Sequence, residues 1–89
     1  MPKGEIGWRR VTAEGERVQV YARRVGGEWR FFVRSRRYER WIEQAEPPLE
    51  DWLKLLDAVQ RRVTRRLFEP QEIERIRRTI IERFPDAVV

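Results

Sequence analysis

The chain has 89 residues, which is enough for one hydrophobic core and too few for two. Apolar residues make up 40% of it, including four Trp and four Phe, so we expect it to fold although 39% of its residues are charged. It has no cysteine for a disulfide, and no apolar run approaches the ~20 residues of a membrane-spanning helix. Its first residues lack the apolar core of a signal peptide, so a single cytoplasmic domain over residues 1–89 is predicted.

The absence of histidine as well as cysteine removes most catalytic and metal chemistry. A zinc site needs Cys or His ligands, and nucleophiles activated by histidine cannot be built. No paired-carboxylate motif argues for a magnesium site or an acid–base pair, and the glycines form no phosphate-binding loop. We therefore expect a protein that is not an enzyme, with no catalytic residue, no cofactor and no metal site.

The first half of the chain has the signals of a β-sheet. A weak strand is predicted over residues 6–13, and residues 17–24 and 28–35 alternate with the period of two that is typical of strands. Gly26-Gly27 suits a two-residue hairpin loop because both glycines adopt positive φ without strain. Glu14-Gly15 is interpreted as a second tight turn. Residues 37–43 either extend the third strand or form a short fourth one.

The second half has helical periodicity after Pro47-Pro48. Apolar residues recur three or four apart on a first helix (Leu49, Trp52, Leu56, Val59, Val63 and Leu67) and on a second helix (Ile73, Ile76, Ile80 and Phe84). Pro70 begins the second helix and Pro85 ends it, which leaves 85–89 as a tail. Residues 47–84 are thus predicted to form a helical hairpin. The fold class is α+β: an antiparallel meander of three or four strands, followed by two C-terminal helices packed on one sheet face.

The net charge of +5 is unevenly distributed. Residues 1–44 hold eleven Lys and Arg against six Asp and Glu, whereas residues 45–89 hold nine of each. In the helical half the charges form pairs four residues apart, such as Asp57 with Arg61 and Glu74 with Arg78, which are typical of solvated helix faces. The arginines near residues 61–66 suit the C-terminal end of a helix dipole. The unexplained positive charge therefore lies in the sheet half.

The predicted hairpin register separates an apolar face from an arginine-rich face. With Gly26-Gly27 as the loop, the apolar face contains Val18, Val20, Ala22, Trp29, Phe31 and Val33. The opposite face pairs Tyr21 with Phe32, Arg23 with Arg30, Gln19 with Arg34 and Arg17 with Arg36, which amounts to five arginines and no acid. If Glu14-Gly15 is also a two-residue loop, Trp8 lies beside Tyr21 and Arg10 beside Gln19.

Aromatic rings among arginines are typical of surfaces that bind single-stranded nucleic acid, because bases stack on the rings and arginines neutralise phosphates. The candidate nucleic-acid-binding residues are Trp8, Arg10, Arg17, Tyr21, Arg23, Arg30, Phe32, Arg34 and Arg36. The alternative is a protein-interaction or structural module, either monomeric or homo-oligomeric. In that interpretation Tyr38, Trp41 and Ile42 cover the aromatic row, and Glu5, Glu39 and Glu43 neutralise the arginines. Neither interpretation involves a membrane.

Overall fold

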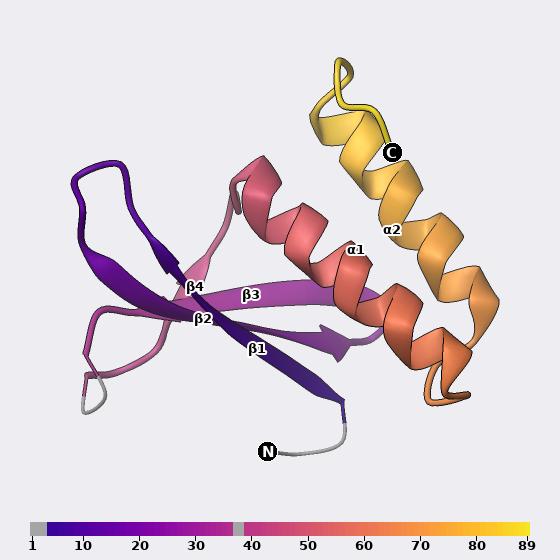
Figure 1. Cartoon of the computed structure of the whole chain (residues 1–89), viewed down its shortest axis with the longest axis horizontal. Coiled ribbons are helices and arrows are strands. Elements are labelled where there is room, and N and C mark those ends of the chain that lie inside the picture. Colours follow the sequence, from indigo (N-terminus) through magenta and orange to yellow (C-terminus); the bar gives the residue numbers. More distant parts are fainter. Residues whose placement is uncertain (1–3, 37–38) are drawn as a thin grey trace. The chain divides into compact units, whose positions relative to one another are not determined.

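The computed structural model describes residues 4–36 and 39–89 (Figure 1). The chain divides into two compact units, Met1–Pro47 and Pro48–Val89, and each is described by itself. The first contains a β-sheet and the second contains two α-helices. The predicted α+β class, and the predicted order of a strand meander followed by two C-terminal helices, are confirmed.

The sheet has four antiparallel strands in the spatial order β1-β2-β3-β4 (Figure 1). They are β1 (Glu5–Val11), β2 (Arg17–Val25), β3 (Glu28–Arg34) and β4 (Ile42–Gln44). The segment whose role the sequence left open therefore contributes a short fourth strand, in which Ile42 pairs with Val33 and Gln44 with Phe31. Tyr38 lies outside the described residues.

The turn between β2 and β3 confirms the predicted two-residue loop. Gly26 and Gly27 both have positive φ, 58° and 86°, as the favoured hairpin turn requires. The ladder pairs Tyr21 with Phe32, and the other pairs follow: Arg23 with Arg30, Gln19 with Arg34, Ala22 with Phe31 and Val20 with Val33. Here the glycine positions alone were sufficient to predict the register.

The turn between β1 and β2 is one residue longer than predicted, and the predicted register was wrong. The Thr12 N–H donates to the Glu16 carbonyl at 2.8 Å, and the Gly15 N–H donates to the Thr12 carbonyl at 2.9 Å. The Glu16 N–H also donates to Thr12 Oγ1 at 3.1 Å. Gly15 has φ +85°, so Ala13 is part of the loop, which has the geometry of a type I turn followed by a glycine bulge.

The longer loop moves β1 by one residue along β2. Trp8 pairs with Val20 and Arg10 with Val18, while Gly7 pairs with Tyr21. A shift of one residue exchanges the two faces of a strand. Trp8 and Arg10 therefore lie on the opposite face from Tyr21, contrary to the sequence prediction.

The two faces of the sheet differ in burial. The inner face contains the apolar side chains predicted for the core, and Val20, Ala22 and Phe31 are each at most 1% exposed. Ile6 and Val18 are buried on the same face. The outer face contains the alternate residues of each strand, namely Glu5, Gly7, Arg9, Val11, Arg17, Gln19, Tyr21, Arg23, Val25, Glu28, Arg30, Phe32, Arg34 and Glu43. None of these outer-face residues is buried.

The first helix, α1 (Leu49–Thr64), ends earlier than its apolar stripe suggested. The Arg66 N–H donates to the Val63 carbonyl and the Leu67 N–H to the Arg62 carbonyl, at 2.9 and 2.8 Å. These two bonds, with Arg66 at φ 60°, form a Schellman motif that terminates the helix. Leu67 lies beyond the helix and is 56% exposed, so it does not continue the stripe.

The second helix, α2 (Pro70–Arg83), packs against α1 (Figure 1). Ile76 and Ile80 of its predicted stripe are buried, as are Trp52 and Val59 of α1. The described part of the chain contains no helix with the length and apolarity to span a bilayer.

Candidate nucleic-acid interface

Three aromatic rings meet on the outer face of the sheet. Tyr21 of β2 and Phe32 of β3 are ladder partners, and their rings stack with centroids 4.8 Å apart and planes inclined by 14°. Trp41, which immediately precedes β4, meets Tyr21 edge-on with a centroid distance of 4.6 Å. All three side chains are half-buried. They form an aromatic cluster, defined here as Tyr21, Phe32 and Trp41.

Two arginines of the outer face stack on this cluster. The Arg23 guanidinium lies 5.4 Å from the centroid of Phe32, and the Arg34 guanidinium lies 4.2 Å from the centroid of Trp41. Arg34 Nε also donates a hydrogen bond of 2.7 Å to Gln19 Oε1. A guanidinium over a ring contributes ~0.5–1 kcal/mol at an exposed site. Both arginines are thus held beside the rings while their charge stays at the surface.

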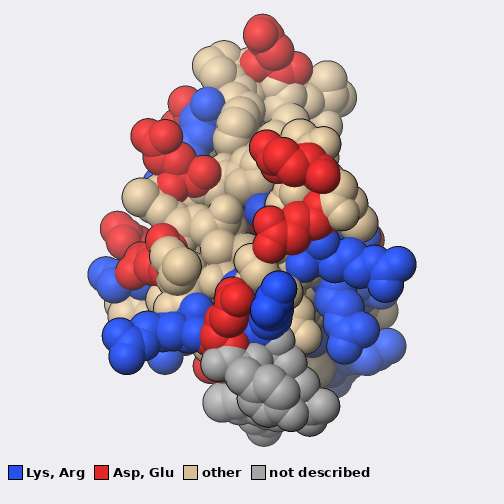
Figure 2. Space-filling model, turned by 90° about the vertical axis from the view of Figure 1, so that its left-hand side faces the viewer, with Lys and Arg blue, Asp and Glu red and all other residues tan. Residues whose placement is uncertain are grey.

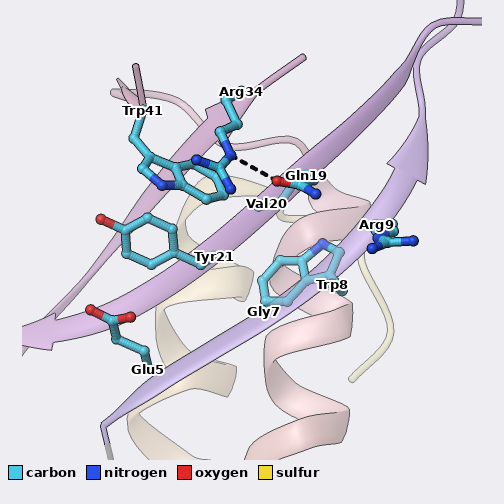
Figure 3. A pocket seen from close by; sticks show the side chains of 9 residues that line it. All are labelled: Glu5, Gly7, Trp8, Arg9, Gln19, Val20, Tyr21, Arg34 and Trp41. Carbon is cyan, nitrogen blue, oxygen red and sulfur yellow. Dashed lines mark hydrogen bonds between the residues drawn. The ribbon is translucent and has the colours of Figure 1, made fainter. Parts of the chain in front are cut away.

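A groove beside the cluster has a volume of about 570 Å³. Its lining comes from β1, β2, β3 and the residue before β4, with Tyr21, Trp41 and Arg34 on one side and Arg9 on the other (Figure 3). The full lining of this aromatic groove is Glu5, Gly7, Trp8, Arg9, Gln19, Val20, Tyr21, Arg34 and Trp41. The groove therefore offers a ring surface together with two guanidinium groups and one carboxylate.

Six of the nine predicted site residues share the outer face. These are Arg17, Tyr21, Arg23, Arg30, Phe32 and Arg34. Arg36 is exposed but lies beyond the end of β3, so the predicted pair of Arg17 with Arg36 is not part of the ladder.

The prediction that Trp8 and Arg10 lie on the outer face was wrong, because both lie on the inner face. Trp8 packs edge-on against buried Phe31, with centroids 6.1 Å apart and planes inclined by 74°. Arg10 Nη2 donates to Gln44 Oε1 at 3.5 Å. The aromatic row predicted from Trp8, Tyr21 and Phe32 is replaced by a cluster in which Trp41 is the third ring.

Arg9 was not among the candidate residues predicted from the sequence, and Trp41 was assigned only to the covering segment of the alternative interpretation. Arg9 pairs with Gln19 on the outer face because of the three-residue loop. The signal for that loop was Thr12 followed three residues later by Gly15, a spacing that favours a type I turn. Trp41 was predicted as part of a covering segment, and its contact with Tyr21 confirms that portion of the alternative interpretation. Ile42, in contrast, is 66% exposed and its ladder partner is the inner-face residue Val33.

The outer face also contains carboxylates: Glu28 contradicts the prediction that the hairpin has no acid on this face, whereas Glu5 and Glu43 were named in the alternative interpretation. Glu28 pairs with Val25 at the turn end of β3, Glu5 pairs with Arg23, and Glu43 pairs with Phe32. On the side of the molecule in Figure 2, Lys and Arg side chains form separate groups with Asp and Glu side chains among them. The arginines of the outer face are therefore accompanied by three carboxylates on its strands.

Within residues 4–36 and 39–89, no three His, Cys, Asp or Glu side chains come together as a group that could hold a metal ion. Comparison of the chain with protein-family models, curated proteins and solved structures gave no significant match in any of the three. The chemistry of the outer face is thus the basis for a functional proposal.

Proposed function

We propose that the sheet unit binds single-stranded nucleic acid through its outer face. The observation that carries the proposal is the half-buried aromatic cluster of Tyr21, Phe32 and Trp41, with Arg23 and Arg34 stacked on its rings. Bases that stack on such rings contribute ~1–3 kcal/mol each, with little dependence on sequence. Arginines beside the rings release counterions from the phosphates.

The residues that we propose for binding follow the observed register and differ from those proposed from the sequence. Tyr21, Phe32 and Trp41 provide stacking surfaces. The arginines that contact phosphates are those of the outer face: Arg9, Arg17, Arg23, Arg30 and Arg34. Trp8 and Arg10 leave the set because their side chains belong to the inner face.

The direct test is fluorescence anisotropy of a labelled oligothymidylate and of the matching duplex. We expect micromolar binding of the single strand that weakens between about 50 and about 200 mM salt, with a log–log slope near −3 if about four phosphates are contacted. The duplex should bind more weakly because its bases are not available for stacking. No binding of the single strand at micromolar protein in low salt contradicts the proposal.

Ring substitutions separate binding from folding. The double variant Tyr21→Leu, Phe32→Leu keeps apolar side chains but removes two stacking surfaces, and it should weaken binding at least about tenfold. Tyr21→Ala with Phe32→Ala should have a larger effect on binding, together with some loss of thermal stability. Arg78→Gln, at an exposed position of α2, is the matched control for loss of one positive charge. Loss of binding by the leucine variant, while it remains folded at the temperature of the binding assay, supports the proposal.

A second candidate function is contact with a protein partner or a second copy of the chain. It is favoured by the carboxylates of Glu5, Glu28 and Glu43, which give the outer face both signs of charge. Under this candidate, light scattering should report a dimer that the leucine variant dissociates, and the oligonucleotide should not bind.

A further inference from the structure

A second hollow of about 530 Å³ adjoins the aromatic groove. Its polar lining consists of Arg9, Arg10, Arg17, Gln19 and Ser35, and we call it the arginine pocket. The aromatic groove and the arginine pocket share Arg9 and Gln19. A single ligand that occupied both would therefore place a planar group near Tyr21 and Trp41 and its other end among arginines.

The lining of the arginine pocket suits an anion. Its lining contains Arg9 and Arg17 of the outer face and no carboxylate, while the guanidinium of the third arginine, Arg10, is bonded to Gln44 on the inner face. Arg9 and Arg17 are exposed, and neither forms an ion pair with another residue that the structure describes. The Ser35 hydroxyl adds a neutral donor. Guanidinium groups bind phosphate oxygens through charge-assisted, often bidentate hydrogen bonds, so phosphate is the anion that best fits this pocket.

Carboxylates lie beyond the turn end of the arginine pocket, and one carboxylate, Glu5, lines the aromatic groove itself. Past Arg17 the chain enters the β1–β2 turn, in which Glu14 and Glu16 are exposed. At the opposite end of the strands, Glu5 is the ladder partner of Arg23, and Glu28 is the first residue of β3. A polyanion that continued past the arginine pocket would meet the carboxylates of the turn. The geometry therefore favours a phosphate with no further nucleotide attached beyond it.

We propose that the arginine pocket holds a terminal phosphate monoester, and that the base of the same nucleotide lies in the aromatic groove. This inference rests on the proposed function and specifies the ligand of that site. A monoester carries about −1.5 to −2 charges at neutral pH, compared with −1 for an internal phosphodiester, so two or more arginines discriminate between them. The same chemistry is present at the phosphorylated end of a strand and in a free mononucleotide.

The test compares oligothymidylates of about ten nucleotides that differ only at one end. One strand carries a 5′-phosphate, one carries a 3′-phosphate and one carries neither. Each phosphorylated strand has its fluorophore at the end opposite to the phosphate. The unphosphorylated strand is prepared in two forms, one with the fluorophore at the 5′ end and one with it at the 3′ end. We expect one phosphorylated form to bind about tenfold more tightly than the unphosphorylated strand. Equal affinity of all three overturns this inference and leaves the proposed function intact, whereas failure of all three to bind overturns both.

Competition with thymidine monophosphate, thymidine and inorganic phosphate identifies the source of the phosphate. If thymidine monophosphate displaces the labelled strand as effectively as the unlabelled phosphorylated strand does, the site is assigned to free nucleotides. Displacement only by the strand assigns it to strand ends. Either result supports the inference, whereas displacement by thymidine as effective as that by its monophosphate overturns it.

Two matched arginine variants locate the phosphate. Arg17→Gln removes a guanidinium from the arginine pocket and should reduce the preference for the phosphorylated strand to near unity. Arg23→Gln, on the same face of β2 but outside that pocket, should weaken both forms by the same factor. Equal loss of the preference in the two variants contradicts the assignment of the pocket.

Discussion

Two adjacent phenylalanines of β3 show how the two faces of the sheet differ. Phe31 faces inward, is 1% exposed and touches Trp8 edge-on. Phe32 faces outward, is half-buried, and has Tyr21 stacked on it and Arg23 over it. The same residue type thus contributes to the buried core on one face and to a half-buried aromatic cluster at the surface on the other.

Burial alone does not explain which residue types occupy the outer face. A face selected only for stability would tend to have opposite charges in directly opposed positions, because opposed like charges are unfavourable. Instead Arg23 and Arg30 are ladder partners. In the helical unit, by contrast, Arg61 pairs with Asp57 at 3.1 Å and Arg77 with Glu74 at 2.9 Å. Arg23 also faces Glu5 on β1, so the opposed arginines of β2 and β3 are the feature that the proposed binding of nucleic acid would account for.

The largest expected effect concerns the inner face. Phe31→Ala should lower the free energy of unfolding by about 3–5 kcal/mol, because it removes a fully buried ring and leaves a cavity. Urea denaturation followed by circular dichroism measures this change. A loss below about 1 kcal/mol would show that the inner face is not a packed core.

The neighbouring substitution on the outer face should cost less. Phe32→Ala should lower the free energy of unfolding by about 1.5–2.5 kcal/mol, since a half-buried ring loses its stack with Tyr21 and its contact with Arg23. The same denaturation experiment gives the difference between the two variants directly. Equal losses for Phe31→Ala and Phe32→Ala would remove the contrast between the faces.

The turn that sets the faces of β1 can be tested at Gly15. Nothing lies within 4 Å of a Cβ added there, so Gly15→Ala tests the φ of +85° alone and should cost about 1 kcal/mol. Gly15→Asn should recover part of this loss because asparagine tolerates the left-handed conformation. If the alanine and asparagine variants are both as stable as the parent, the glycine bulge does not define this turn.

A smaller effect is expected from Arg34→Gln. It removes the stack on Trp41 and the hydrogen bond to Gln19, which together should lower the free energy of unfolding by about 0.5–1 kcal/mol. Arg17→Gln is the control, because an exposed arginine without an ion pair to a described residue should change stability by no more than about 0.5 kcal/mol. A stability loss at Arg17 as large as that at Arg34 would indicate a structural rather than a binding role for Arg17.

The sequence by itself determined the features that depend on neighbouring residues. The Gly26-Gly27 loop defined the register of β2 and β3, because two glycines with positive φ suit one turn geometry. Prolines and apolar spacing indicated where both helices begin, and charge spacing predicted the pair of Asp57 with Arg61. The prediction of Glu74 with Arg78 was less successful, because Glu74 contacts Arg77 instead.

The tertiary structure alone decided which residues share the outer face. The β1–β2 loop has one residue more than predicted. As a result Arg9, rather than Trp8 and Arg10, lies on the outer face, because strand side chains alternate and a shift of one residue exchanges the faces. The contact of Trp41 with Tyr21 joins segments far apart in the chain, and the sequence offered it only as part of the alternative interpretation. The aromatic cluster and the arginine pocket are therefore products of strand pairing, although each of their side chains is visible in the sequence.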